Sequence, residues 1–202
     1  MFMRTNYQKT MTIKAYFKEE KAHYNSRSKR IIISDQSSSQ FDHFTFVIIE
    51  NQKTGEELYC LQFTSEHNCS VFRDLVVWNN LLVIGFDNFC YIFNLETEHV
   101  VKYKLNSFFD SFFITEQHVL LSSLSNIDCF NSDAVFMWRS EKLGNESIKI
   151  SKVENNIIYG SGKWDEAGWK EFQLPLSTGG VGEKTKKKSI FTSFFKKQTI
   201  YF

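Results

Sequence analysis

Proline and glycine are scarce in this chain, which has one proline and nine glycines among its 202 residues. Average usage of about 5% and 7% would give roughly 10 and 14, so collagen-like and Pro/Gly-rich disordered chains are excluded. A large excess of either charge is also missing, because 24 basic residues face 23 acidic ones. In contrast, 16% of the residues are aromatic, with 21 phenylalanines, and this predicts a folded chain with ample apolar surface to bury.

Long apolar runs are absent as well. The first twenty residues carry charges throughout and lack the apolar segment of a signal peptide. Nowhere do about 18 consecutive apolar residues follow one another, as a transmembrane helix requires. The spacing of Cys60, Cys69, Cys90 and Cys129 matches neither a redox pair nor a zinc site. We expect a cytoplasmic protein with buried, reduced cysteines, and a Cys60–Cys69 disulfide is the alternative.

The apolar segments are short, rich in β-branched and aromatic residues, and alternate with polar ones, which is typical of strands. The pairs Asn79–Asn80, Asp87–Asn88, Glu116–Gln117 and Asn155–Asn156 are polar breaks expected of tight hairpins, since Asn tolerates left-handed backbone. The sequence therefore predicts an all-β antiparallel meander, with residues 1–182 as one domain. Predicted strands cover residues 11–18, 44–50, 57–63, 75–78, 81–84, 89–95, 99–105, 112–115, 119–124, 134–138, 148–153, 157–160 and 170–174.

The turns recur at a nearly constant spacing. Threonine-containing turns lie at 52–55, 95–98 and 176–179, with their threonines 43 and 81 positions apart, and a missing member is expected near 138–140. A second pair of segments shows the same repeat, because residues 77–85 match residues 153–160, with their Asn–Asn pairs 76 positions apart. A period near 40 residues with roughly four strands is the spacing of β-propeller blades. It predicts about four blade-like units, in a ring that is incomplete or open. A β-sandwich or irregular meander is the alternative.

The segment from Leu82 to Thr97 resembles propeller repeats of the quinoprotein or WD kind. The stretch 160–165, together with Trp169, Phe172 and 178–179, is similar to a pattern of uncharacterised bacterial proteins. The resemblance covers residues 44–180 and implies an architecture, with no catalytic residues to transfer. The pair Trp164–Asp165 does not stand where a blade ends, so it is not a WD signature.

No residue set predicts a reaction. The five histidines are scattered, so the sequence shows no local group of histidines spaced to bind one metal ion. No nucleophile elbow is present, and we interpret 160–162 as a flexible turn. In 179–185, Glu183 stands where a phosphate-binding loop needs glycine. We therefore expect no enzyme activity, no metal and no cofactor.

Two tryptophans, Trp164 and Trp169, stand in the polar segment from Lys163 to Lys170. Tryptophan is enriched at binding hot spots, so they could anchor a partner. They could also fold back over the end of the domain and cap its core, and this is the interpretation we favour.

The near-neutral net charge hides two opposite parts. Residues 183–202 have six lysines against one glutamate, a net +5, which leaves −4 for the rest. Ile190, Phe191, Phe194 and Phe195 would share one face of a helix in this basic aromatic tail. Its lysines Lys186, Lys187 and Lys188 are candidate contacts with a membrane or nucleic acid. We favour a helix docked on its own domain.

An acidic body without a catalytic site favours a binding protein. We expect a protein-binding module, in its most specific form an immunity protein that masks the active site of a cognate toxin such as a nuclease, because opposite charges speed association. One alternative is a ligand binder or enzyme using the mouth of a propeller, and another is a scaffold attached through the tail. Candidate partner contacts are Glu96, Glu98, Asp128, Asp133, Trp164, Asp165 and Trp169.

Overall fold

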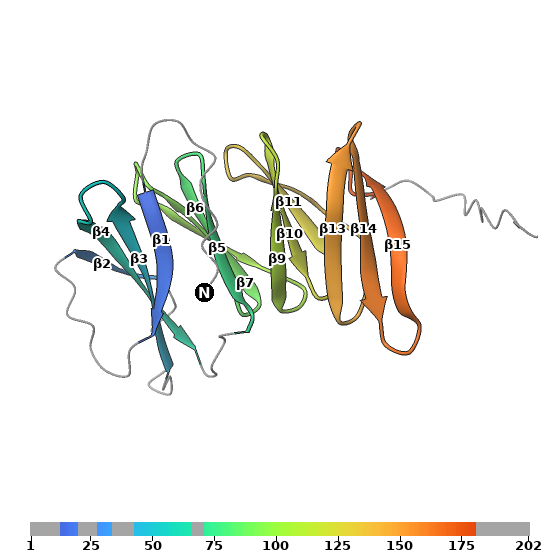
Figure 1. The fold of residues 1–202 in the computed structure, drawn as a ribbon, viewed down its shortest axis with the longest axis horizontal. Coiled ribbons are helices and arrows are strands. Elements are labelled where there is room, and N and C mark those ends of the chain that lie inside the picture. Colours follow the sequence, from blue (N-terminus) through green and yellow to red (C-terminus); the bar gives the residue numbers. More distant parts are fainter. Residues whose placement is uncertain (1–12, 20–27, 34–42, 66–70, 181–202) are drawn as a thin grey trace, which may run out of the picture.

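The computed structural model describes residues 13–19, 28–33, 43–65 and 71–180. These residues form fifteen strands and no helix, so no helix that could span a membrane occurs among them. The predicted tail, with Lys186, Lys187 and Lys188, lies outside the described residues. Figure 1 shows the strands gathered into successive sheets.

Three of the four sheets are simple meanders of antiparallel hairpins. The second sheet contains β5 (Arg73–Trp78), β6 (Leu81–Phe86), β7 (Phe89–Asn94) and β8 (Val100–Lys104), side by side in that order. The third contains β9 (Phe109–Ile114), β10 (His118–Ser123), β11 (Ile127–Asn131) and β12 (Phe136–Arg139). The fourth contains β13 (Ser147–Glu154), β14 (Ile157–Trp164) and β15 (Gly168–Pro175). In each of these sheets the first strand forms one edge, beside the first strand of the neighbouring sheet, and we call it the innermost strand; successive hairpins add the other strands.

The first sheet is built differently. It contains β1 (Ile13–Glu19), β2 (Lys29–Ile32), β3 (His43–Asn51) and β4 (Glu57–Ser65), in the order β1-β3-β4-β2, and β2 runs parallel to β4. Neither β2 nor β11 was among the predicted strands. β2 has only four residues, two of them basic, and it pairs with a strand far along the chain, so no local alternation marks it.

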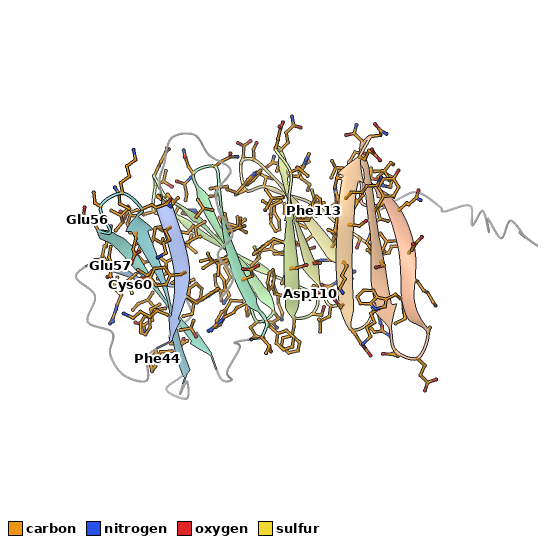
Figure 2. The ribbon with its side chains drawn as sticks, in the orientation of Figure 1. Phe44, Glu56, Glu57, Cys60, Asp110 and Phe113 are labelled. Atoms are coloured by element: carbon orange, nitrogen blue, oxygen red, sulfur yellow. The ribbon has the colours of Figure 1, made fainter. Side chains whose placement is uncertain are left out.

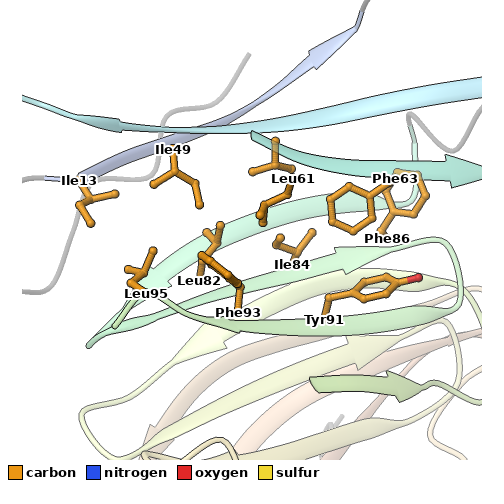
Figure 3. Close-up of a cluster of buried hydrophobic side chains, with 11 residues drawn as sticks. Ile13, Ile49, Leu61, Phe63, Leu82, Ile84, Phe86, Tyr91, Phe93 and Leu95 are labelled. Atoms are coloured by element: carbon orange, nitrogen blue, oxygen red, sulfur yellow. The ribbon is translucent and has the colours of Figure 1, made fainter. Parts of the chain in front are cut away.

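The sheets pack face to face in chain order, with one apolar core between each pair of neighbours (Figure 1). Figure 3 shows the first core, in which Leu61 and Phe63 from β4 face Leu82 and Ile84 from β6. The first and fourth sheets lie at opposite ends of the molecule, and no core cluster joins them within the described residues. The prediction of about four propeller-like blades is confirmed, and they form an open stack.

Hairpin turns at one equivalent place in the sheets repeat at the predicted spacing. Residues 79–80, 116–117 and 155–156 each join the innermost strand to the next in the second, third and fourth sheets. Asn79, Asn155 and Asn156 adopt positive φ angles of 54°, 51° and 60°, as tight hairpins require. The match between 77–85 and 153–160 therefore reports two true repeats.

The threonine turns are only partly equivalent. Turn 95–98 follows the third strand of its sheet, as 176–179 does, but 52–55 joins the two middle strands of the first sheet. The missing member is the β11–β12 turn at 132–135, which comes early because β9 begins only 36 positions after β5. The expected position near 138–140 is wrong.

Close contacts hold adjacent sheets in register. Gly85 of β6 leaves room for the Phe109 ring, since a Cβ there would lie 2.2 Å from it. Asp110 of β9, labelled in Figure 2, accepts hydrogen bonds from the Ser147 hydroxyl at 2.7 Å and the Ile148 amide at 2.9 Å. The Trp138 indole donates to the Leu176 carbonyl at 2.8 Å. Steric fit thus joins the second sheet to the third, and hydrogen bonds join the third sheet to the fourth.

Three cysteines are buried and free, namely Cys60, Cys90 and Cys129. Cys60 therefore forms no disulfide, and Cys69 lies outside the described residues. Burial raises the pKa of the Cys129 thiol to about 12, which keeps it protonated. The expectation of small buried hydrophobic residues is confirmed for these three.

Candidate functional site

Hairpin turns from all four sheets lie along one side of the stack, at one end of its strands, and we call this side the turn rim. It comprises residues 52–56, 79–80, 95–99, 115–117, 132–135 and 155–156 and lies along the upper edge of Figure 1. Because neighbouring strands alternate in direction, the remaining hairpins, such as 165–167, lie at the opposite end of the strands. Loops on a rigid scaffold are the usual place for binding residues.

Three asparagines give these turns a common construction. The Asn51 side-chain oxygen accepts from the amides of residues 53 and 54, and that of Asn94 accepts from residues 96 and 97 at 2.9 Å each. The Asn131 oxygen accepts from the amides of Asp133 and Val135 at 3.0 and 2.9 Å. Each turn is thereby held by its own first residue, since Asn side chains readily mimic a backbone acceptor. These bonds fix the acidic residues that follow.

Carboxylates collect on the turn rim. Glu56, Glu96, Glu116 and Asp133 are exposed there, and Figure 2 shows Glu56 at this end of the first sheet. None of these four forms a salt bridge with the residues that the structure describes. Lys53 is a basic residue in the same turns. The rim is therefore a region of negative potential.

A polar hollow of about 300 Å³ lies on the rim where the second and third sheets meet. It brings together two predicted contacts, Glu96 from the β7–β8 turn and Asp133 from the β11–β12 turn. Glu96 accepts a hydrogen bond from the Asn80 amide, which orients its carboxylate. The hollow is lined by Asn79, Asn80, Leu81, Asn94, Glu96, Ser132 and Asp133. Two carboxylates among amide groups suit a cation with several N–H donors, such as an ammonium or guanidinium group.

Glu98 lies on the same rim in a different setting. Its carboxylate pairs with the Lys29 ammonium and accepts from the Tyr59 hydroxyl at 3.2 Å. The hydrogen bond from Lys29 lowers the pKa of Glu98, while partial desolvation opposes this shift. Glu98 thus ties β2 and β4 to the β7–β8 turn, and its charge is already neutralised.

Asp128 does not belong to the surface. Its side chain is 0% exposed, and its two oxygens accept from Arg139 Nε at 2.6 Å and Nη2 at 3.2 Å. Burial raises the pKa of Asp128, although the hydrogen bond from Arg139 opposes the shift. The prediction of Asp128 as a partner contact is wrong. Asp128 was interpreted as a loop residue, but it lies within β11 and forms an ion pair with Arg139 of β12.

Trp164, Asp165 and Trp169 lie away from the turn rim. The segment 163–170 is a strand hairpin, with Trp164 at the end of β14, Asp165 in the turn, and Trp169 in β15. Trp169 is 44% exposed with Lys149 Nζ 4.7 Å from its ring centre, so it does not cap the core. Trp164 is half-buried beneath Lys142 and Lys170. The predicted contacts therefore do not form one surface.

Glu56, Glu116 and the asparagines of the hollow were not among the contacts predicted from the sequence. A signal was present, because Asn51, Asn94 and Asn131 stand 43 and 37 positions apart and each opens a turn. Among the described residues no group of three or more His, Cys, Asp or Glu side chains is placed to hold a metal ion. The hollow is the polar concave feature that combines predicted residues from two sheets.

No model of a known protein family matches the chain, and no curated protein sequence matches it. Three solved structures that it resembles are KlHsv2 with loop 6CD replaced by a Gly-Ser linker (TM-score 0.47, 9% identity), BamB from Moraxella catarrhalis (0.44, 12%), and the dihydro-heme d1 dehydrogenase NirN in complex with DHE (0.38, 10%). The matches cover 66%, 65% and 68% of this chain and 44%, 40% and 34% of those chains, respectively. The chain thus spans less than half the length of these structures.

Proposed function

We propose that this chain is a non-enzymatic protein-binding module whose turn rim engages a basic surface of a protein partner. The observation that carries the proposal is the gathering of Glu56, Glu96, Glu116 and Asp133, without salt-bridge partners among the described residues, on one rim of a rigid stack. Charges presented in this way accelerate association with an oppositely charged protein and favour it over other partners.

The specific form of the proposal is an immunity protein that neutralises a cognate bacterial toxin, such as a nuclease, by covering its active site. A nuclease must attract phosphates, so its active-site surface is basic and complementary to an acidic rim. Blocking requires only that the rim lie over that surface, and no chemistry is needed from the chain itself.

The test is to mix the full chain with the purified product of the adjacent gene and measure binding by calorimetry and size-exclusion chromatography. We expect a complex whose association rate falls with added salt, since exposed charges are screened. Glu96→Lys and Asp133→Lys together should slow association at least tenfold. Glu166→Lys, at an exposed position on the opposite end, is the matched control and should change it little.

The outcomes distinguish the general protein-binding function from the specific toxin-neutralising form. A complex that leaves nuclease activity intact would rule out the toxin-neutralising form and keep the binding module. A complex equally sensitive to Glu166→Lys and to the two rim substitutions would place the contact elsewhere and contradict the role of the turn rim. Absence of a complex would contradict the toxin-neutralising form.

A further inference from the structure

Exposed apolar side chains lie on the outermost strands of the second and third sheets, and we call them the edge patch. Val101 of β8 is 39% exposed, Val135 directly before β12 is 53% exposed, and Phe136 and Met137 at the start of β12 are 37% and 50% exposed. Both strands are outer edges of their sheets. Clustered exposed apolar side chains on a soluble domain mark interaction surfaces more often than isolated ones do.

The edge patch stands on a firm aromatic base. The Phe136 ring stacks on Tyr103 with ring centres 4.8 Å apart and an interplanar angle of 24°. Phe130 meets both rings edge-on, at 5.8 Å from Phe136 and 5.2 Å from Tyr103. Tyr103 and Phe130 belong to adjacent sheets, so the platform crosses the boundary between them. Phe136 is therefore held before any partner arrives, which reduces the entropy lost on binding.

The edge patch and the acidic hollow are parts of one structural unit. Asp133 lines the hollow, Val135 begins the patch, and the Asn131 side chain accepts the backbone N–H of both. Ala134 between them has a positive φ of 62°, which reverses the chain within this turn. On the second sheet, Glu96 lies in the β7–β8 turn and Val101 lies in β8, directly after that turn. An acidic site and an apolar platform thus lie side by side on the same two sheets.

We infer that the hollow and the edge patch together bind a peptide segment of a protein partner in which an arginine or lysine stands beside a large apolar side chain. The cationic end enters the hollow between Glu96 and Asp133, and the apolar side chain packs on Phe136. The inference rests on the proposed binding function and names the partner's chemistry. Buried aromatic contacts joined to charge-assisted hydrogen bonds are the usual composition of an interface hot spot.

The test is selection of a phage-displayed library of random dodecapeptides on the full chain, followed by calorimetry with a synthetic peptide from the selection. We expect enrichment of arginine or lysine next to aromatic or aliphatic residues. Glu96→Gln with Asp133→Asn should weaken that peptide at least tenfold, and so should Phe136→Ala. Glu166→Gln and Val71→Ala are matched controls, because Glu166 is exposed on the opposite end and Val71 is an exposed apolar side chain outside the patch. Both controls should bind as the unaltered chain does.

Several outcomes would overturn the inference. These are a selection without basic residues, a selection that returns no binder, or an affinity unchanged by Glu96→Gln with Asp133→Asn. Self-association of the chain that Phe136→Ala abolishes would assign the patch to a second copy instead. Because Phe136 stacks on Tyr103, thermal unfolding of Phe136→Ala checks its fold, and the two hollow substitutions provide an independent readout.

The inference and the proposed function can fail separately. If the neighbouring gene product binds and the hollow variants leave its affinity unchanged, the inference is wrong and the binding function stands. If the selected peptides depend on Glu96, Asp133 and Phe136 while that gene product does not bind, the inference is supported and the toxin-neutralising form is wrong.

Discussion

Arg139 and Asp128 form an ion pair whose removal should cost more stability than any exposed pair in the protein. Arg139 donates to both Asp128 oxygens, to the Asn106 side chain, and to the Lys104 carbonyl at 2.9 Å, so it connects the third sheet to the end of the second. The Asp128 side chain is fully buried. Arg139→Met keeps much of the side-chain volume and removes every one of these donors.

The expected cost follows from the burial of the remaining carboxylate. Breaking a buried pair from one side costs about 3–5 kcal/mol, because it leaves an uncompensated charge. For a chain of this size, each 1 kcal/mol shifts the melting temperature by roughly 2–4 °C, so a fall of about 6–20 °C is expected. Lys152→Met is the control, since Lys152 and Glu154 are 56% and 55% exposed, and such pairs contribute below about 1 kcal/mol.

Two further measurements separate charge burial from lost packing. Asp128→Leu combined with Arg139→Met replaces the pair with apolar side chains and should recover most of the lost stability. In Arg139→Met the native pKa of Asp128 lies above its unfolded value, so the folded state binds the proton more tightly. The cost is then full above the native pKa and shrinks as pH falls through it toward the unfolded value. Urea unfolding measured across that pH range tests both points. A cost for Arg139→Met no larger than for Lys152→Met, or independent of pH, would refute the reasoning.

Three other outcomes are expected. Gly85→Ala should destabilise by about 1–3 kcal/mol in urea unfolding, because its new methyl group meets the Phe109 ring, and Phe109→Leu in the same chain should relieve part of that cost; additive costs would contradict the contact. Lys29→Met should raise the carboxyl pKa of Glu98 toward its ordinary value in an NMR titration, since the lowering comes first from the Lys29 hydrogen bond; an unchanged titration would show that the pair does not form. In a Cys69→Ser chain, a thiol reagent should label the three buried cysteines only after denaturant is added, since burial shields them; rapid labelling of the native chain would refute their burial.

Local sequence predicted the hairpins well because a tight turn depends on few residues. Asn79–Asn80 and Asn155–Asn156 each lie between alternating apolar segments, and the structure places both pairs at the predicted hairpins. Their separation of 76 positions correctly indicated two repeats of one unit. The 52–55 turn was grouped with 95–98 and 176–179 although it joins different strands, because its residue types indicate the shape of a turn and not its place in a sheet.

The candidate site was only partly predictable. Glu96 and Asp133 were identified as acidic loop residues, but nothing local places residues 37 positions apart in one hollow. Asp128 has the same chemistry as Asp133 and the opposite environment. The difference comes from Arg139, which reaches it only after β11 and β12 have paired.

The amino-acid sequence by itself determined the all-β class, most of the hairpin turns and a repeat near 40 residues, because strand alternation and turn chemistry are properties of neighbouring residues. The predicted flexible turn at 160–162 is wrong, since these residues lie within β14 and pair with strands on both sides. Tertiary structure decided that the blades form an open stack, that β2 joins the first sheet in parallel, and which acidic residues face solvent. These features depend on contacts between segments far apart in the chain, where the packing of whole sheets outweighs local preference.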